Sequence, residues 1–429
     1  MSKTRAFFIG LFCIWQFSIS QNNPNLEFFL KNARGNNLSL KENNNLGEIG
    51  IIQSEIIKAK NNAFQIDATA EVLFAPYFNN YGRAIDITTT PSPNAYGYDV
   101  GITNGGLYSA QVNVTKNLFN QATVANLLFQ NKVKTDSISL SSEEISHNIS
   151  KNITDFYVIA YQLQLQEEFT KEILKDLEKR LQVVELLVKR GILQESDYLL
   201  LQLDIESKRL ELEQIKNNKE VAISQLYSSS GMEVETIETL PEPIFFFEKS
   251  FAKAERFYER KFSNDSLQVL AQQKVFDNIY RPRLIAYGNT GLNAVEIPNI
   301  ENKIGASAGL RLTIPIYDGR QRYYNTKQNE FRKENLEYFK DNAEIKLENT
   351  INSITSQLKN LEKNKALLEK QIQKQENILE IYKGKLVQGQ VSIVDYLNVV
   401  QNYKQNVYTQ LQMQTNKWLL QSQYNFINW

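Results

Sequence analysis

Apolar and polar residues alternate along one short stretch in each half of the chain. From 304 to 316 the even positions hold isoleucine, alanine or leucine, and the odd positions hold mainly glycine and polar residues. The stretch from Tyr108 to Thr115 repeats this alternation. A period of two predicts strands with one apolar and one polar face. With less regular partner strands opening at Ala75-Pro76 and Arg281-Pro282, the pattern predicts two β-hairpins, at about 70–116 and about 283–316.

The stretches that follow the hairpins change to a helical period. Residues 120–190 and 320–383 contain neither glycine nor proline, and a helix of about 70 residues reaches roughly 100 Å. Apolar side chains recur every three or four positions in both stretches, as in a coiled coil. In the first stretch they are Leu174, Leu177, Leu181, Val184 and Val188. In the second they are Leu347, Ile351, Ile354, Leu358 and Leu361, and the pattern continues through Leu368, Ile372, Leu379, Tyr382 and Leu386. A second helix after each turn glycine completes two helical hairpins, at about 118–230 and about 320–427.

The two halves of the chain repeat one another at a fixed offset. Four matching pairs lie 198 positions apart, namely Gly191 and Gly389, Asp197 and Asp395, Tyr198 and Tyr396, and Leu199 and Leu397. Such an offset is the signature of a tandem structural repeat. We therefore expect a mixed α and β fold, mostly α, with a first repeat at 21–240 and a second repeat at 241–429.

The first twenty residues have the features of a secretory signal peptide. Lys3 and Arg5 precede an apolar run from 6 to 17, which is too short to span a bilayer as a helix, and cleavage is expected before Gln21. The only cysteine, Cys13, lies inside this segment. Removing Lys3 and Arg5 from 48 basic residues leaves 46 against 48 acidic ones, a formal charge of −2. This balance does not suggest a nucleic-acid surface.

The predicted strands demand assembly of several copies. Four strands from one chain are too few for a barrel, because about eight are needed before the interior accommodates side chains. An open sheet with an apolar face also cannot sit in a bilayer, where every backbone polar group must be paired. Several identical chains closing one barrel satisfy both conditions.

The repeated β-hairpin and long helical hairpin, the Pro-x-Tyr-Asp-Gly motif at 315–319 and the Gly-x5-Asp tips at 191–197 and 389–395 resemble the TolC-type outer-membrane efflux family. The resemblance implies a homotrimer whose twelve-stranded transmembrane β-barrel in outer-membrane lipid is continued by an α-helical tunnel through the periplasm. It also implies a passive exit duct of a tripartite efflux or type I secretion system, opened by a periplasmic adaptor protein and an inner-membrane transporter. It does not indicate the substrate, or which adaptor and transporter take part.

The helical tips carry the candidate functional residues. By the resemblance, Asp395 falls on a carboxylate ring at the pore entrance, while Asn398 replaces a second acidic position of the family. Gly191, Asp197, Gly389 and Ser392 belong to the tips that the adaptor contacts. These residues also have a structural interpretation, since Ser392 and Asp395 fit a helix capping box and the glycines fit helix C-termini.

No arrangement of catalytic residues is evident, so we expect no enzyme activity and no cofactor. We also expect no metal site, because one histidine, three methionines and no cysteine outside the predicted signal do not favour a soft-metal relay. The alternative function is a periplasmic adaptor, which carries a single long helical hairpin rather than two in register.

Overall fold

The computed structural model describes residues 24–88, 90–96, 108–234, 239–245, 252–295, 297 and 299–428. The predicted signal peptide and Trp429 lie outside the described residues. The chain divides into two compact units. The helical unit comprises Met1–Asn37, Asn148–Glu248 and Ser353–Phe426, and the sheet unit comprises Leu38–His147, Lys249–Asn352 and Ile427–Trp429.

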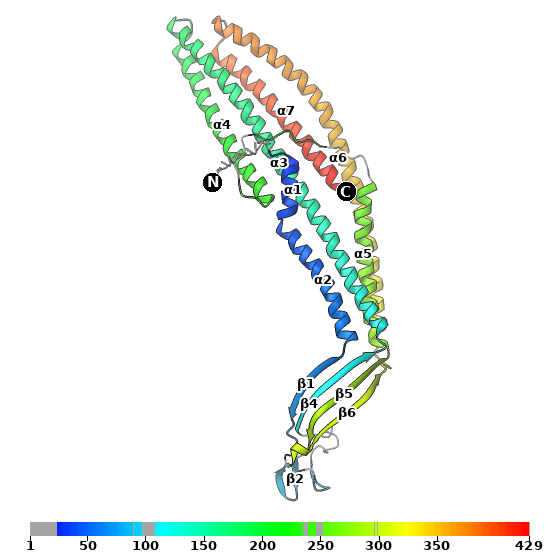
Figure 1. The fold of residues 1–429 in the computed structure, drawn as a ribbon. Helices are drawn as coiled ribbons and strands as arrows, with labels where there is room; N and C mark the ends of the chain where they lie inside the picture. The colour runs from blue at the N-terminus through cyan, green and yellow to red at the C-terminus, as the bar shows by residue number, and fades with distance from the viewer. Residues whose placement is uncertain are drawn as a thin grey trace, which may run out of the picture. The chain divides into compact units, whose positions relative to one another are not determined.

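The sheet unit is built on four antiparallel strands in the order β1-β4-β5-β6 (Figure 1). Their bounds are Gln65–Val72 for β1, Tyr108–Leu118 for β4, Arg283–Ala294 for β5 and Ile304–Thr313 for β6. The strands predicted from alternation at 108 and 304 are confirmed as β4 and β6. Because β4 also pairs with β5, the strands of the two repeats form one continuous sheet.

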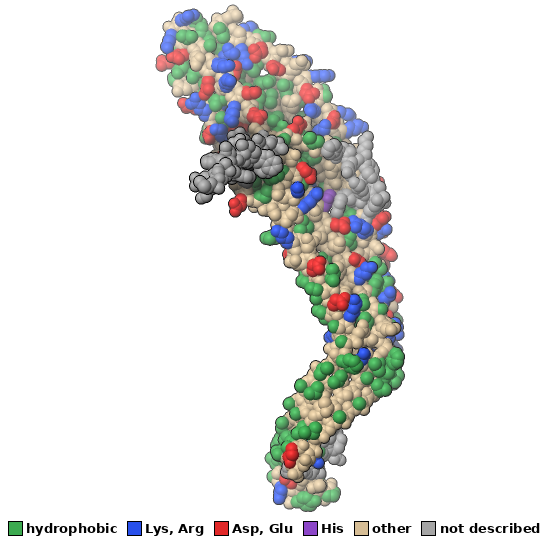
Figure 2. Space-filling model, in the orientation of Figure 1, with side chains coloured by type: hydrophobic (Ala, Val, Ile, Leu, Met, Phe, Trp, Pro, Cys, Tyr) green, Lys and Arg blue, Asp and Glu red, His purple; other side chains and the backbone are tan. Residues whose placement is uncertain are grey.

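The register places every even-numbered residue of the four strands on one face. Across the three pairings even positions meet even positions, as in Ala68 with Val112, Ala110 with Leu292, and Ala286 with Leu310. Directly opposed residues point to the same side of a sheet. In these strands the only charged side chain on the even face is Lys116, whereas the odd face is rich in amides, hydroxyls and charges. The part of the surface that the sheet forms in Figure 2 accordingly shows few charges.

The position of the first repeat's upstream strand differs from the sequence prediction. No strand of the large sheet opens at Ala75; its strand β1 has already ended at Val72. Residues 77–80 and 83–86 form β2 (Tyr77–Asn80) and β3 (Arg83–Asp86), a separate small hairpin. Proline lacks the N–H that a ladder needs, so Pro76 is a poor position inside a strand. The alternation from Ile66 to Val72 was the signal for the true strand.

Each pair of strands is preceded and followed by helices. Helix α2 (Leu38–Asn62) leads into β1, and α5 (Ala252–Asp277) leads, through the short η2 (Asn278–Tyr280), into β5. The strands β4 and β6 continue into the long helices α3 (Gln121–Lys189) and α6 (Gln321–Val387), and η3 (Ile300–Asn302) precedes β6. The sequence predicted the two long helices but neither α2 nor α5.

Helix α2 lies closely against α3 within the sheet unit. The Asn131 side-chain amide on α3 donates hydrogen bonds to the carbonyl of Gly50 at 2.6 Å and to the hydroxyl of Ser54 at 2.8 Å. A Cβ at Gly50 would lie 2.4 Å from the Thr135 hydroxyl. The Thr135 side chain would have to rotate to relieve this clash. Glycine at this position therefore permits the close approach of the two helices.

The helical unit contains two helical hairpins and the short α1 (Leu26–Asn36). Helices α4 (Glu195–Ser229) and α7 (Ile393–Ile427) begin and end 198 positions apart, at 195 against 393 and at 229 against 427. This agreement confirms the repeat offset in three dimensions. The described helices include none long and apolar enough to cross a membrane.

Two hydrophobic cores hold the helical unit together. One core joins α1 to α3 and α4 around Phe29, Tyr157 and Leu226, which are fully buried. The Tyr157 hydroxyl donates a 2.7 Å hydrogen bond to the carbonyl of Pro241, so the start of the link between the repeats is tied to this core. The second core lies between the two hairpins beside their tips.

Candidate functional site

The tip of the first helical hairpin is closed by backbone hydrogen bonds around Gly191. Its N–H donates to the carbonyl of Val188 at 2.9 Å, and the N–H of Ile192 donates to the carbonyl of Leu187 at 2.9 Å. This is the Schellman arrangement, which needs a left-handed residue after the helix. Gly191 has φ +73°, a value that glycine adopts without steric cost.

The tip of the second hairpin repeats this geometry at Gly389, which has φ +68°. Its N–H donates to Leu386 at 3.0 Å, and the N–H of Gln390 donates to Lys385 at 2.9 Å. Both glycines therefore occupy the position just after a helix C-terminus that the sequence predicted for them.

Side chains then cap the helix that leaves each tip. The Asp395 N–H donates to the Ser392 hydroxyl at 3.1 Å, and that hydroxyl donates to the Asp395 carboxylate at 2.7 Å. At the first tip the backbone N–H of Gln194 donates to the Asp197 carboxylate at 3.0 Å. The carboxylates of Asp197 and Asp395 therefore both lie in the first turn of a helix, where negative charge is favourable. At Asp395 the capping box is only half formed, because its carboxylate binds the Ser392 hydroxyl rather than the Ser392 backbone N–H.

The two tips contact one another directly. A Cβ on Gly389 would lie 2.5 Å from Cγ2 of Ile192, so a side chain there forces the neighbouring tip to shift. Below the tips, one core contains buried side chains from both hairpins. In this core the hydroxyl of Tyr396 on α7 donates to the Asp176 carboxylate of α3 at 3.2 Å, and burial raises the pKa of Tyr396. The ends of the four long helices therefore pack as one structure.

Asp395 and Asn398 lie on the exposed side of α7. They are three residues apart and both are exposed, while Tyr396 and Val400 between and beyond them are buried in the shared core. Asp197 on α4 is only half-buried and Ser392 is exposed. Asp395 and Asn398 can therefore face a pore, and their place at its entrance stays a prediction.

A buried charged cluster on α4 and α7 was not predicted from the sequence. The Lys404 ammonium of α7 pairs with the Glu211 carboxylate of α4, and Lys208 lies 3.6 Å from the same carboxylate. The Tyr408 hydroxyl donates to Glu211 at 3.1 Å. Single positions such as Lys208 and Lys404 carry no local signal of burial, because long charged side chains are mostly exposed.

The protonation of this cluster follows from its surroundings. Burial lowers the pKa of Lys404, although the hydrogen bond with Glu211 opposes that shift. Burial alone raises the pKa of Glu211, but the hydrogen bond and charge of Lys404, with the charge of Lys208, bring that pKa below its ordinary value. Lys404 and Glu211 therefore form an ion pair, and Lys208 lies beside it, 4.0 Å from the Asp204 carboxylate.

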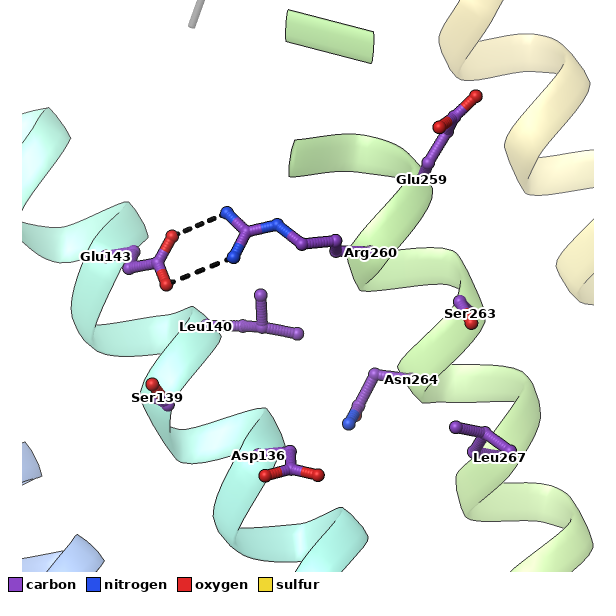
Figure 3. Close-up of a pocket in the computed structure, with 9 residues that line it drawn as sticks. All are labelled: Asp136, Ser139, Leu140, Glu143, Glu259, Arg260, Ser263, Asn264 and Leu267. Atoms are coloured by element: carbon purple, nitrogen blue, oxygen red, sulfur yellow. Dashed lines mark hydrogen bonds and ion pairs between the residues drawn. The ribbon is translucent and has the colours of Figure 1, made fainter. Parts of the chain in front are cut away.

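The sheet unit contains an open groove of about 480 Å³ between α3 and α5 (Figure 3). Arg260 reaches across from α5, and its two terminal nitrogens donate to the Glu143 carboxylate at 3.3 and 2.6 Å. Such a two-pronged pair holds a guanidinium in place, and the hydrogen bond raises the pKa of Arg260. The Arg260–Glu143 ion pair therefore joins α5 to α3 across the groove. Among the described residues, no group of three or more histidine, cysteine or acidic side chains is placed to hold a metal ion.

Comparison of the whole fold with solved structures identifies its class. The outer membrane protein VceC of Vibrio cholerae superposes with a TM-score of 0.71 at 14% identity, over 94% of this chain and 96% of that one. The outer-membrane channel OprN superposes with a TM-score of 0.73 at 12% identity, over 95% and 90% of the two chains. The Campylobacter jejuni CmeC outer membrane channel gives 0.70 at 15% identity, over 95% and 86%.

The chain therefore has the fold of outer-membrane channel proteins, and the predicted resemblance to TolC-type channels is confirmed at the level of the fold. By sequence alone, no family model and no curated protein matches the chain.

Proposed function

We propose that this protein is a subunit of an outer-membrane exit duct, a passive conduit whose barrel is closed by several copies of the chain. The observation that supports this most directly is the four-stranded sheet with two open edges and one apolar face. Its strands β1, β4, β5 and β6 have 8, 11, 12 and 10 residues, each within one residue of the length of about 9–11 residues that crosses a bilayer.

Lipid on the even face explains why large apolar side chains remain exposed there. Ile66, Ile304 and Leu310 each keep more than 65% of their surface open in the single chain, and transferring such surface from water to hydrocarbon is favourable. The odd face, with Asp67, Asn113 and Arg311 among its side chains, would line a water-filled lumen. Three copies, the number that the family resemblance implies, give twelve strands.

We further propose that the helical tips face the periplasm, where an adaptor and an inner-membrane transporter engage them. Their exposed acidic and amide residues on α7 are suited to a wet entrance. A periplasmic adaptor function is less well supported, because two long hairpins here share one core and one face of the sheet is apolar apart from Lys116 and Thr290.

Fractionation and conductance test the proposal. The full chain, expressed with its signal, should be recovered in the outer membrane, and the purified protein should form ion-conducting pores in planar bilayers. Recovery as a soluble periplasmic protein without conductance would refute it.

A further inference from the structure

We propose that the wall of the barrel carries a binding site for anionic solutes, formed by Arg283 and Arg311 at the end of the sheet from which the long helices leave. This inference rests on the proposed function, since the two side chains line a lumen only when the sheet is part of a barrel. It adds the class of solute that the duct favours, namely molecules with an oxyanion group such as phosphate or carboxylate.

The register of β5 and β6 brings the two arginines together on the odd face. Arg283 is the first residue of β5 and lies opposite Thr313, while Arg311 on β6 lies opposite Ile285. The two arginines are therefore diagonal neighbours, at a spacing of about 7–8 Å that long side chains can bridge. Both side chains are exposed in the single chain. One oxyanion between them can accept hydrogen bonds from both guanidinium groups.

An aromatic ring holds the Arg311 side chain in place. The guanidinium carbon lies 5.4 Å from the centre of the Tyr287 ring, a distance typical of a cation–π contact. Tyr287 lies opposite Gly309, where a Cβ would come within 2.6 Å of the Tyr287 hydroxyl and 2.7 Å of its ring carbon Cζ. Glycine at this position therefore lets the ring lie across β6. Stacking uses the flat face of a guanidinium and leaves N–H groups at its edge to bind a ligand.

Neither arginine is neutralised within its own chain. In the part of the chain that the structure describes, no acidic side chain pairs with Arg283 or Arg311. The acids that flank β5 and β6 in the sequence are engaged elsewhere. Asp277 accepts a hydrogen bond from the Arg322 side chain at 3.1 Å, and Asp318 accepts one from the Arg322 backbone N–H at 2.8 Å. Like charges on neighbouring strands repel, and an anion bound between the two arginines removes that repulsion.

The acids of the odd face lie farther along the sheet. Asp67 and Glu71 are on β1, at the opposite edge of the sheet from β6. Through the successive pairings Asp67 is level with Ser307, four residues from Arg311, which is about 14 Å along a strand. Glu71 is farther still. This separation exceeds the Debye length of about 8 Å at physiological ionic strength, so these acids leave the charge of the arginines in the same copy largely uncompensated.

Repetition by symmetry turns the arginine pair into a ring. Three copies, the number that the family resemblance implies, place six guanidinium groups around one level of the lumen. Rings of arginine or lysine are the arrangement by which pores favour anions and phosphates. Each guanidinium can also bind two oxygens of one carboxylate or phosphate. The arginine pair therefore supplies both a positive field and specific donors for an oxyanion.

Ion selectivity in planar bilayers tests the positive field. In the full-length protein, Arg283→Gln combined with Arg311→Gln should lower the chloride-to-potassium permeability ratio severalfold, as measured from the reversal potential in a gradient of potassium chloride. Lys116→Gln is the matched control. Lys116 is also basic and is level with Ala286 and Leu310, but it lies on the even face, so its loss should leave the ratio unchanged. An unchanged ratio in the double variant, as expected if acids of a neighbouring copy neutralise both arginines, would overturn the proposal.

Block by an added oxyanion tests the binding itself. Pyrophosphate or citrate should reduce the conductance of the wild type, and the double variant should lose this block. Arg311→Lys keeps the charge but loses the two-pronged edge and the stacking, so it should keep the permeability ratio and weaken block severalfold. Tyr287→Leu should weaken block in the same way, because Arg311 loses the ring that holds it. Block by neither anion, or equal block in the wild type and these two single variants, would overturn the site.

Failure of this inference and failure of the proposed function give different results. If the wild type conducts but selectivity and block do not change as described, the anion site is wrong while the duct stands. A wild type without pores would instead refute the proposed function. If the double variant forms no pores, Arg283→Gln and Arg311→Gln are measured singly, and each should lower the permeability ratio relative to Lys116→Gln.

Discussion

Replacing Glu211 by glutamine should strongly destabilise the helical unit. The carboxylate is the partner of Lys404 and also lies 3.6 Å from Lys208. The side chains of these lysines are only 6% and 8% exposed. Glutamine has nearly the same shape but no charge, so it leaves Lys404 without its partner, next to Lys208. Among the described residues, Lys208 then keeps only the Asp204 carboxylate, at 4.0 Å, as an acidic neighbour.

The size of the effect follows from burial. Breaking a buried ion pair costs about 3–5 kcal/mol, because the remaining charge stays desolvated. The Glu211 side chain is 27% exposed, so water partly screens the change and we expect the lower end, about 3 kcal/mol. Glu213→Gln is the control. Its side chain is 61% exposed and pairs with Lys216 three residues on, so its loss should cost at most about 0.5 kcal/mol.

The pH dependence provides a second check. Burial lowers the pKa of Lys404, so above that pKa the unfolded chain binds more protons than the folded one and stability rises with pH. Without Glu211 the pKa of Lys404 falls further. The loss in free energy of unfolding caused by Glu211→Gln should therefore shrink as the pH is raised from 7 towards about 10.4, the ordinary lysine pKa.

Denaturant titration of the purified protein, followed by circular dichroism, measures these differences. Equal losses for Glu211→Gln and Glu213→Gln, or a deficit that stays constant over this pH range, would refute the account of the cluster.

Three further predictions concern the barrel and the tips. Leu310→Arg should destabilise the barrel in bilayers by about 2–4 kcal/mol if Leu310 faces lipid near the membrane centre, and unimpaired folding in lipid vesicles would contradict that orientation. Asp395→Ala should raise single-channel conductance and weaken block by multivalent cations, and Asn398→Asp should strengthen block; unchanged block in planar bilayers would leave only the capping role, worth about 0.5–2 kcal/mol. Gly389→Ala should loosen the contact with Ile192, since it introduces both a clash and a strained positive φ. Protease cleavage at the tips should then become faster, and an unchanged rate would show that the tip contact is dispensable.

The sequence determined the elements that depend on local periodicity. Alternation over β4 and β6 fixed two strands and their apolar face, because a strand places successive side chains on opposite sides whatever it pairs with. The long stretches without glycine or proline fixed α3 and α6, and Gly191 and Gly389 marked their ends, since a left-handed position favours glycine wherever it occurs. Capping at Ser392 and Asp395 was predictable for the same local reason.

Only the tertiary structure decided which parts meet. The partner of β4 at the start of the chain is β1 rather than a strand opening at Ala75, because pairing depends on the register across the sheet and not on the nearest strand-like segment. Likewise, Lys208, Glu211 and Lys404 resemble ordinary surface charges along the sequence, and their burial arises only when α4 and α7 pack together. The separation of α2 into a face packed on α3 and an exposed stripe also required the structure, because its apolar residues occur on both sides of the helix.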